Sequence, residues 1–143
     1  MKHLFFLIAL LLFAFGAKAQ RVFDIQSSST DTLKNQTTKT YATNTSGYGT
    51  GPAIIDVPYY YSVYCAADSL SGSNAGTAKL QVCNDHTGTD WYTLQTLTID
   101  GTSRSQALWE GILYARRVRI YFDMPSGTRQ VRPVVHAIFK RVY

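Results

Sequence analysis

The chain has 143 residues and a mass of 16.0 kDa, which is enough for one domain of ordinary size and too little for two. Aromatic residues make up 13% of the sequence, including ten Tyr, whereas charged residues make up 16% and include a single Glu, Glu110; the formal net charge is +5. Helical bundles and coiled coils need Glu, Lys, Leu and Ala in bulk, so this composition excludes that class.

The first 19 residues have the features of a secretory leader. Lys2 and His3 precede an apolar run over residues 4–17, and Ala17-Lys18-Ala19 forms a small-x-small cleavage site that would leave Gln20 at the mature N-terminus. The run is short for a spanning helix, which needs about 20 residues, although a retained membrane anchor is the alternative. No Cys follows the run, so a lipoprotein is excluded. We expect an extracytoplasmic protein (secreted, at a cell surface or in a virion) that contacts a membrane only if the leader is retained.

Residues 20–52 are rich in Ser, Thr, Asn and Gly and contain few large apolar side chains. Such a composition buries too little surface to offset the entropy of ordering the chain by itself. It predicts an extended, flexible arm with a Thr-rich edge strand around residues 37–43.

From residue 53 to residue 143 the pattern changes to short β-branched and aromatic runs separated by Gly, Asn, Asp and Ser. These runs predict strands over 54–66, 77–83, 91–99, 118–122 and 131–142, with a short strand or irregular crossover over 107–114. Turn clusters occupy 68–76, 84–90 and 125–127, and no segment after the leader has helical spacing. Several strands at about ten-residue intervals predict an all-β protein, an antiparallel β-sandwich or jelly roll.

The two cysteines, Cys65 and Cys83, each lie in a predicted strand. An exported chain with an even number of cysteines favours a disulfide, and two buried thiols are the alternative. If residues 59–66 and 78–83 form a hairpin about Asn74, Cys65 and Cys83 fall opposite one another. We therefore expect a bridge between neighbouring strands.

The sequence contains no recognisable catalytic or metal-binding motif. His86 and His136 lack the Cys-x-x-Cys or His-x-x-x-His spacing of a zinc site. The turn with Asp85 and Asp90 fits a plain polar turn better than a calcium site, which needs six or more oxygen ligands. A Gly-x-Ser-x-Gly nucleophile elbow is also missing from the sequence. We expect a protein that is not an enzyme and that carries no metal or cofactor.

Charge is distributed unevenly along the chain. Eight basic and two acidic residues follow Asp100, a net charge of +6, whereas residues 20–100 carry four basic and seven acidic residues, a net charge of −3. Strand alternation places Arg117 and Arg119 on one face. That face is either simply solvated or contacts an anionic partner such as lipid headgroups, an acidic polysaccharide or a neighbouring subunit. Nucleic acid is the least expected partner of an exported domain, unless the protein lines a virion.

Three consecutive tyrosines, Tyr59, Tyr60 and Tyr61, must point to both faces of a strand, so at least one ring lies at a surface. Tyr and Arg are enriched at the cores of protein interfaces. We expect the protein to associate with itself or with another structural protein through a Tyr- and Arg-rich sheet face that includes Arg117 and Arg119.

One stretch combines a strand, an Asn-Asp turn that leads to Trp, a second strand and a later Ala-Arg-x-Val-Arg-Ile strand. Here it consists of Leu80-Gln81-Val82-Cys83-Asn84-Asp85, Asp90-Trp91, Thr93-Leu94 and Ala115-Arg116-Arg117-Val118-Arg119-Ile120. It resembles discoidin-like (F5/8 type C, galactose-binding-like) modules. It is also similar to small β-sandwich domains of bacteriophage virion proteins, which end in a Gly-Thr-rich hairpin, and Ser126-Gly127-Thr128 matches that hairpin. The resemblance implies a β-sandwich with a turn formed by Asn84, Asp85, Asp90 and Trp91.

The sequence also departs from that pattern. Residues 86–89 lengthen the usual turn, and Arg117 stands where Tyr is usual. No glycan-binding loop of the discoidin-like modules has a counterpart here. We expect Trp91 to fill the core, as a large apolar side chain at the start of a strand, rather than to act as a sugar-stacking platform. The place of Trp109 is left open, with the neighbouring Glu110 and Gly111 suggesting a loop edge.

The leading hypothesis is a non-enzymatic structural or attachment protein, a phage virion component of capsid-associated or spike type. The alternative is a secreted bacterial carbohydrate-binding or adhesion module. Oligomeric state separates the two, because a virion protein assembles with fixed symmetry whereas a glycan-binding module is typically a monomer.

Overall fold

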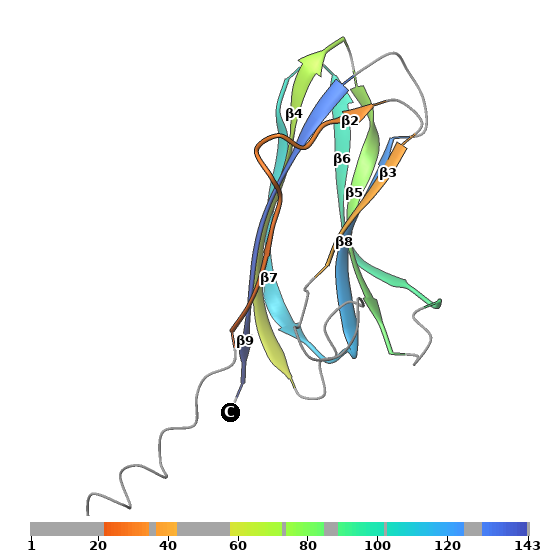
Figure 1. Cartoon of the computed structure of the whole chain (residues 1–143). Helices are drawn as coiled ribbons and strands as arrows, with labels where there is room; N and C mark the ends of the chain where they lie inside the picture. The colour runs from red at the N-terminus through yellow and green to blue at the C-terminus, as the bar shows by residue number, and fades with distance from the viewer. Residues whose placement is uncertain are drawn as a thin grey trace, which may run out of the picture.

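The computed structural model describes residues 22–34, 37–42, 58–72, 74–84, 89–101, 103–124 and 130–142, and every regular element in these ranges is a β-strand (Figure 1). The predicted leader, residues 1–19, lies outside them. No helix in the described part of the chain is long and apolar enough to cross a membrane. The strands are β1 (Val22–Gln26), β2 (Leu33–Lys34), β3 (Thr37–Ala42), β4 (Tyr59–Ser71), β5 (Asn74–Cys83), β6 (Tyr92–Gly101), β7 (Ser105–Leu113), β8 (Arg117–Met124) and β9 (Gln130–Arg141).

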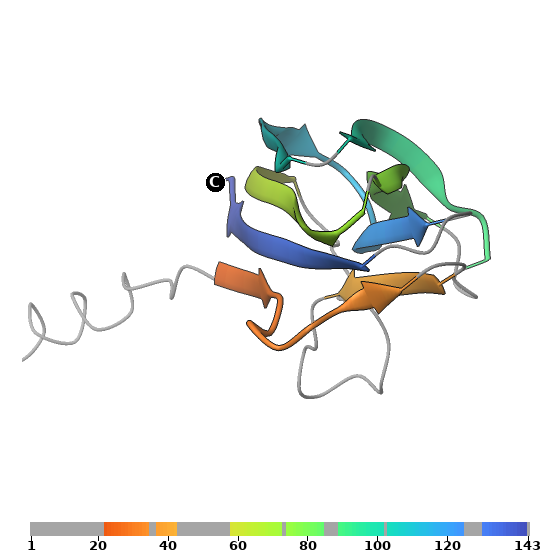
Figure 2. The same cartoon turned by 90° about the horizontal axis from the view of Figure 1, so that it is seen from above.

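The strands form two antiparallel sheets that face one another. One sheet has the order β1-β9-β4-β7, with β2 also paired to β9, and is called the β9 sheet below; the other has the order β3-β8-β5-β6 and is called the β8 sheet. Figure 1 shows the two layers edge-on, and Figure 2 shows β1 beside β9. From β2 onward the chain changes sheet at every connection except β5–β6, which is the connectivity of a jelly roll. The predicted all-β sandwich is confirmed.

The core lies between the sheets and follows the two-residue period of the strands. In β8, the inward Val118, Ile120 and Phe122 are completely buried, while the alternate side chains are half-buried on the outer face. In β9, Val135 and Phe139 are likewise buried, and their neighbours along the strand are half-buried or exposed. These facing apolar rows hold the sandwich together, because each strand contributes a row of side chains removed from water.

The segment expected as an arm contributes strands to both sheets. β1 pairs with β9, and β3 pairs with β8 as an edge strand of the β8 sheet, in agreement with the edge strand expected around residues 37–43. Ile25, Leu33 and Tyr41 all belong to the core. Few apolar residues suffice, because each short strand needs only one or two inward side chains once neighbouring strands satisfy its backbone.

Two predicted boundaries are wrong. Strand β4 extends to Ser71 and β5 starts at Asn74, so the connection between the two strands is much shorter than the turn expected over 68–76. Gly72 has φ 69°, a conformation that glycine adopts without steric cost, and the chain changes sheet there. Residues 107–114, expected as a short strand or irregular crossover, lie almost entirely in the regular strand β7 (Ser105–Leu113), which pairs with β4 along its whole length.

Cys65 and Cys83 are not joined by a disulfide in the structure. The expected hairpin of residues 59–66 with 78–83 is wrong, because β4 and β5 lie in different sheets. Cys65 belongs to the core, whereas Cys83 lies beside Arg117 in a row of β8-sheet residues that alternates with the core positions. The two thiols therefore lie on opposite sides of the β8 sheet.

Candidate functional site

Strand alternation separates the three consecutive tyrosines. Tyr59 and Tyr61 are buried in the core, whereas Tyr60 is 41% exposed on the outer side of the β9 sheet. The hydroxyl of Tyr60 donates a hydrogen bond to Glu110 Oε1 at 3.2 Å, and Ser62 Oγ donates to the same oxygen at 3.2 Å. The hydrogen bond to Glu110 raises the pKa of Tyr60 above its ordinary value. Tyr60 is thus the one member of the trio that can contact another molecule.

Large apolar side chains surround Tyr60 on this outer surface. Tyr60 lies opposite Ile112, Ser62 opposite Ile138, and Tyr64 opposite Leu108. Leu108 and Ile112 are each 61% exposed and Ile138 is 46% exposed. We call the surface formed by Tyr60, Leu108, Ile112 and Ile138 the Tyr60 face.

The other end of the same outer surface is charged. The Asp68 carboxylate, which is 14% exposed, forms ion pairs with Arg104 Nε at 3.2 Å and with Arg132 Nη2 at 2.8 Å. Arg104 comes from the β6–β7 connection, whereas Asp68 and Arg132 face one another across β4 and β9. We call these three residues the Asp68 cluster.

Tyr64 and His136 lie between the Asp68 cluster and the Tyr60 face. Their rings are 6.5 Å apart with an interplanar angle of 27°. Tyr64 Oη accepts a hydrogen bond from Arg104 Nη2 at 2.7 Å and donates one to Gln106 Oε1 at 3.0 Å. A depression of about 440 Å³ borders the Asp68 cluster. It is lined by the three residues of the cluster together with residues 26–29, Pro133, Val134 and His136.

Arg117 and Arg119 do not share a face with Tyr60. Both lie on β8, on the outer side of the opposite sheet. The guanidinium of Arg119 lies 3.9 Å from the Trp91 ring centre and 5.0 Å from that of Tyr121, and its Nε donates to Gln81 Oε1 at 2.8 Å. Burial lowers the pKa of Arg119 below its ordinary value. The tyrosine and the arginines expected on a single face therefore lie on two separate surfaces. Arg119 is held by contacts with neighbouring residues of the β8 sheet.

The core position expected for Trp91 is wrong, and Trp109, whose place the sequence leaves open, belongs to the core instead. Trp109 is 8% exposed and belongs to the core, whereas Trp91 is half-buried against Arg119 on the outer side of the β8 sheet. Trp91 precedes β6 instead of lying within it, so strand alternation does not direct its ring inward.

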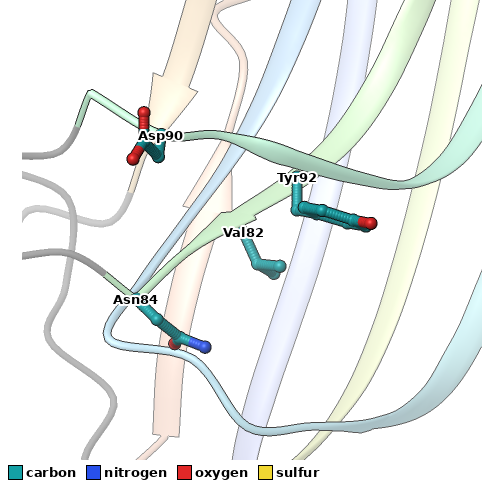
Figure 3. Close-up of a pocket in the computed structure, with 4 residues that line it drawn as sticks. All are labelled: Val82, Asn84, Asp90 and Tyr92. Carbon is teal, nitrogen blue, oxygen red and sulfur yellow. The ribbon is translucent and has the colours of Figure 1, made fainter.

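The predicted turn motif brackets the β5–β6 connection. Asn84 follows β5, Asp90 and Trp91 precede β6, and Asp85 lies outside the described residues. Asn84 Oδ1 accepts a hydrogen bond from the backbone N–H of Arg116 at 3.2 Å, which ties the turn to the start of β8. Val82, Asn84, Asp90 and Tyr92 line a depression of about 420 Å³, and Figure 3 shows Val82 and Tyr92 extending on the same side of the β5–β6 pair. Tyr92 is 78% exposed there.

In the described ranges, no three His, Cys, Asp or Glu side chains lie close enough together to hold a metal ion. What the surfaces offer is non-covalent: exposed apolar side chains on the Tyr60 face, guanidinium groups at the Asp68 cluster and an exposed ring at Tyr92. These groups suit association and ligand binding.

Several surface residues were not singled out in the sequence: Asp68, Arg104, Leu108, Ile112, Arg132 and Ile138. A signal existed in β7, where Leu108 and Ile112 alternate with the core residues Trp109 and Leu113 and so make both faces of the strand apolar. The Asp68 cluster had no such signal, because its members come from three distant segments that only the sheet pairing brings together.

No family model matches the sequence, and no curated protein matches it. Among solved structures, the chain is similar to the globular domain of the zebrafish complement 1qA protein, with a TM-score of 0.46 and 11% identity. The match covers 85% of this chain and 97% of that domain. A similarity of this size carries no functional argument, so the function has to be inferred from the surface chemistry.

Proposed function

We propose that the protein is a non-enzymatic structural or attachment protein that assembles from copies of its own chain through the Tyr60 face. The observation that carries the proposal is the concentration of exposed large apolar side chains on this one surface. Tyr60, Leu108, Ile112 and Ile138 range from 41% to 61% exposed on adjacent strands. Large apolar side chains gathered on one exposed surface mark an interaction site.

The outer side of the β8 sheet provides the contrast. Its exposed positions on β3 and β6 carry threonines, among them Thr38, Thr40, Thr96 and Thr98. Leu94, on the edge strand β6, is 41% exposed. The difference between the two outer surfaces favours the β9 sheet as the place of contact.

Charge on the Tyr60 face favours a second copy of the chain as the partner. Lys140 lies in the same cross-strand row as Tyr60, while Asp24 and Glu110 lie in the neighbouring row. A surface that carries both signs can pair with itself about a two-fold axis, with the lysine of one copy near an acidic residue of the other. A surface of a single sign would repel its own copy.

Within this class we favour a bacteriophage virion component, capsid-associated or of spike type, in keeping with the turn and hairpin pattern of the sequence. The leader supports an extracytoplasmic location. The second candidate is a secreted carbohydrate-binding or adhesion module. It is favoured by Tyr92, a strongly exposed ring beside a depression at the β5–β6 connection (Figure 3).

Sedimentation velocity tests self-association. The doubly substituted protein Leu108→Glu, Ile112→Glu should sediment as a folded monomer at concentrations where the unmodified protein is oligomeric, because carboxylates would be buried against an apolar partner surface. Leu94→Glu, the same kind of change on the opposite sheet, is the matched control and should leave assembly intact. A monomeric unmodified protein that binds neutral glycans through Tyr92 would reject self-assembly and favour the module.

A further inference from the structure

The depression beside the Asp68 cluster combines two features that suit a small anionic ligand. It is concave, and two arginines from different parts of the chain converge on it with His136. The Arg104 and Arg132 side chains are 45% and 44% exposed, so their guanidinium groups are accessible to solvent. This site shares no residue with the Tyr60 face, although the two adjoin where Tyr64 lies opposite Leu108.

The charge of the cluster is incompletely balanced. Asp68 is shared by both arginines, and within the described ranges no second acidic side chain lies within ion-pair distance of either. Two positive charges against one negative leave a net charge of +1 in the depression. A singly charged anion would therefore neutralise the site, whereas a doubly charged one would leave an excess negative charge next to Asp68.

The guanidinium groups are held in place before any ligand arrives. Arg132 donates to Asp68 through both Nε and Nη2, and Arg104 is fixed between Asp68 and the Tyr64 hydroxyl. Preorganised donors lose little side-chain entropy on binding. Each guanidinium has five N–H groups, and those not used on Asp68 or Tyr64 are left to donate to a ligand carboxylate.

The neighbouring rings indicate what the carboxylate is attached to. Tyr64 and His136 stack against one another on the same outer surface, and Tyr64 accepts a hydrogen bond from Arg104. The pair presents apolar ring carbons with polar edges next to the cationic groups. A sugar ring bearing a carboxylate fits this arrangement, with its C–H groups against the rings and its acid group at the arginines.

We propose that the depression binds an acidic sugar residue of the uronic acid type. Arg104 and Arg132 hold the carboxylate, and Tyr64 and His136 contact the sugar ring. The proposal stands independently of self-association, and it identifies a ligand class through which an attachment protein can engage an acidic polysaccharide.

Calorimetric titration of the purified protein with trigalacturonate tests the proposal, with neutral trigalactose, acetate and inorganic phosphate as comparison ligands. We expect binding of trigalacturonate and at least tenfold weaker binding of the other three. Arg104→Gln should weaken trigalacturonate binding about tenfold, the typical effect of losing a charge-assisted hydrogen bond. That variant keeps Arg132 on Asp68 and so leaves the buried carboxylate paired. His136→Ala should weaken binding of trigalacturonate but leave acetate binding unchanged.

Lys79→Gln is the matched control. It removes one positive charge from the opposite sheet, away from both the depression and the Tyr60 face, and should leave binding unchanged. Equal binding of trigalactose and trigalacturonate would overturn the proposal, as would equal binding of acetate or phosphate, or an Arg104→Gln variant with unaltered affinity. Sedimentation of the Arg104→Gln protein should show unchanged assembly, which separates failure of this proposal from failure of the proposed self-association.

Discussion

Neighbouring residues of the same type have different roles here because successive side chains of a strand point to opposite faces. Tyr59 and Tyr61 fill the core, and Tyr60 between them is presented to solvent. Cys65 follows the same alternation and is completely buried. Burial raises the pKa of its thiol to about 12, because the thiolate would be stranded away from water.

We expect neither cysteine to react with Ellman's reagent in the native protein, and two thiols to react once the unreduced protein is denatured. At pH 8 a thiol of pKa about 12 is ionised in only ~1 molecule in 10⁴, and both side chains are also shielded from the reagent. Protein purified from its natural exported source is the appropriate material. Finding no reactive thiol after denaturation would mean that the two cysteines are bridged after all.

Among the elements, the outer side of the β8 sheet is stabilised by an ordered stack of side chains. Arg119 lies against Trp91 and Tyr121, and it hydrogen bonds to Gln81, whose Nε2 in turn donates to Thr93 Oγ1 at 3.1 Å. The stack links β8, β5 and the start of β6. Gln81 is 9% exposed, so its amide depends on these partners for its hydrogen bonds.

Replacing Arg119 with Ala should lower the free energy of unfolding by about 1–3 kcal/mol, because the change removes the cation–π contacts and leaves the Gln81 carbonyl without its donor. Arg119→Lys should recover little of the loss, since an ammonium group cannot stack as a plane between two rings. Urea unfolding monitored by circular dichroism measures both. Lys79→Ala, a cation-to-alanine change on the same outer face, should cost less. Equal losses at positions 79 and 119 would contradict a specific role for the stack.

Across the whole molecule, one polar cluster connects segments of the two sheets. Asp31 follows β1 of the β9 sheet and pairs with Lys39 on β3 of the β8 sheet, while Tyr41 Oη donates to Asp31 Oδ2 at 2.8 Å. Burial raises the pKa of the Asp31 carboxyl, but the hydrogen bonds from Lys39, Tyr41 and the Ser28 N–H outweigh it, so the net shift is downward. The ionised form of Asp31 therefore stabilises the folded state.

This shift sets the pH dependence expected of an Asp31→Asn variant. The stabilisation by ionised Asp31 is fully present above the pKa of the unfolded chain, near 3.8, and is lost as the pH falls through the lower pKa of the folded protein. We expect Asp31→Asn to lower stability by about 1–3 kcal/mol at pH 7 and the difference to shrink below about pH 4. Thermal unfolding at pH 7 and pH 3 measures this. Asp24→Asn, at an exposed position on β1, is the control; a loss at Asp31 that is constant across this range would contradict the assignment.

The sequence by itself determined the strand content, the two-layer class and the alternation that points Tyr60 away from Tyr59 and Tyr61, because these follow from local propensity and the two-residue period of a strand. The edge strand β3 could also be predicted from its threonines. Only the tertiary structure decided which strands are neighbours. The pairing of β4 with β7 and β9 separated Cys65 from Cys83 and Tyr60 from Arg119, and it brought Arg104 and Arg132 together on Asp68. The order of strands in a sheet depends on how apolar faces from distant parts of the chain pack together. The spacing of residues along a single strand does not specify which strands become its neighbours.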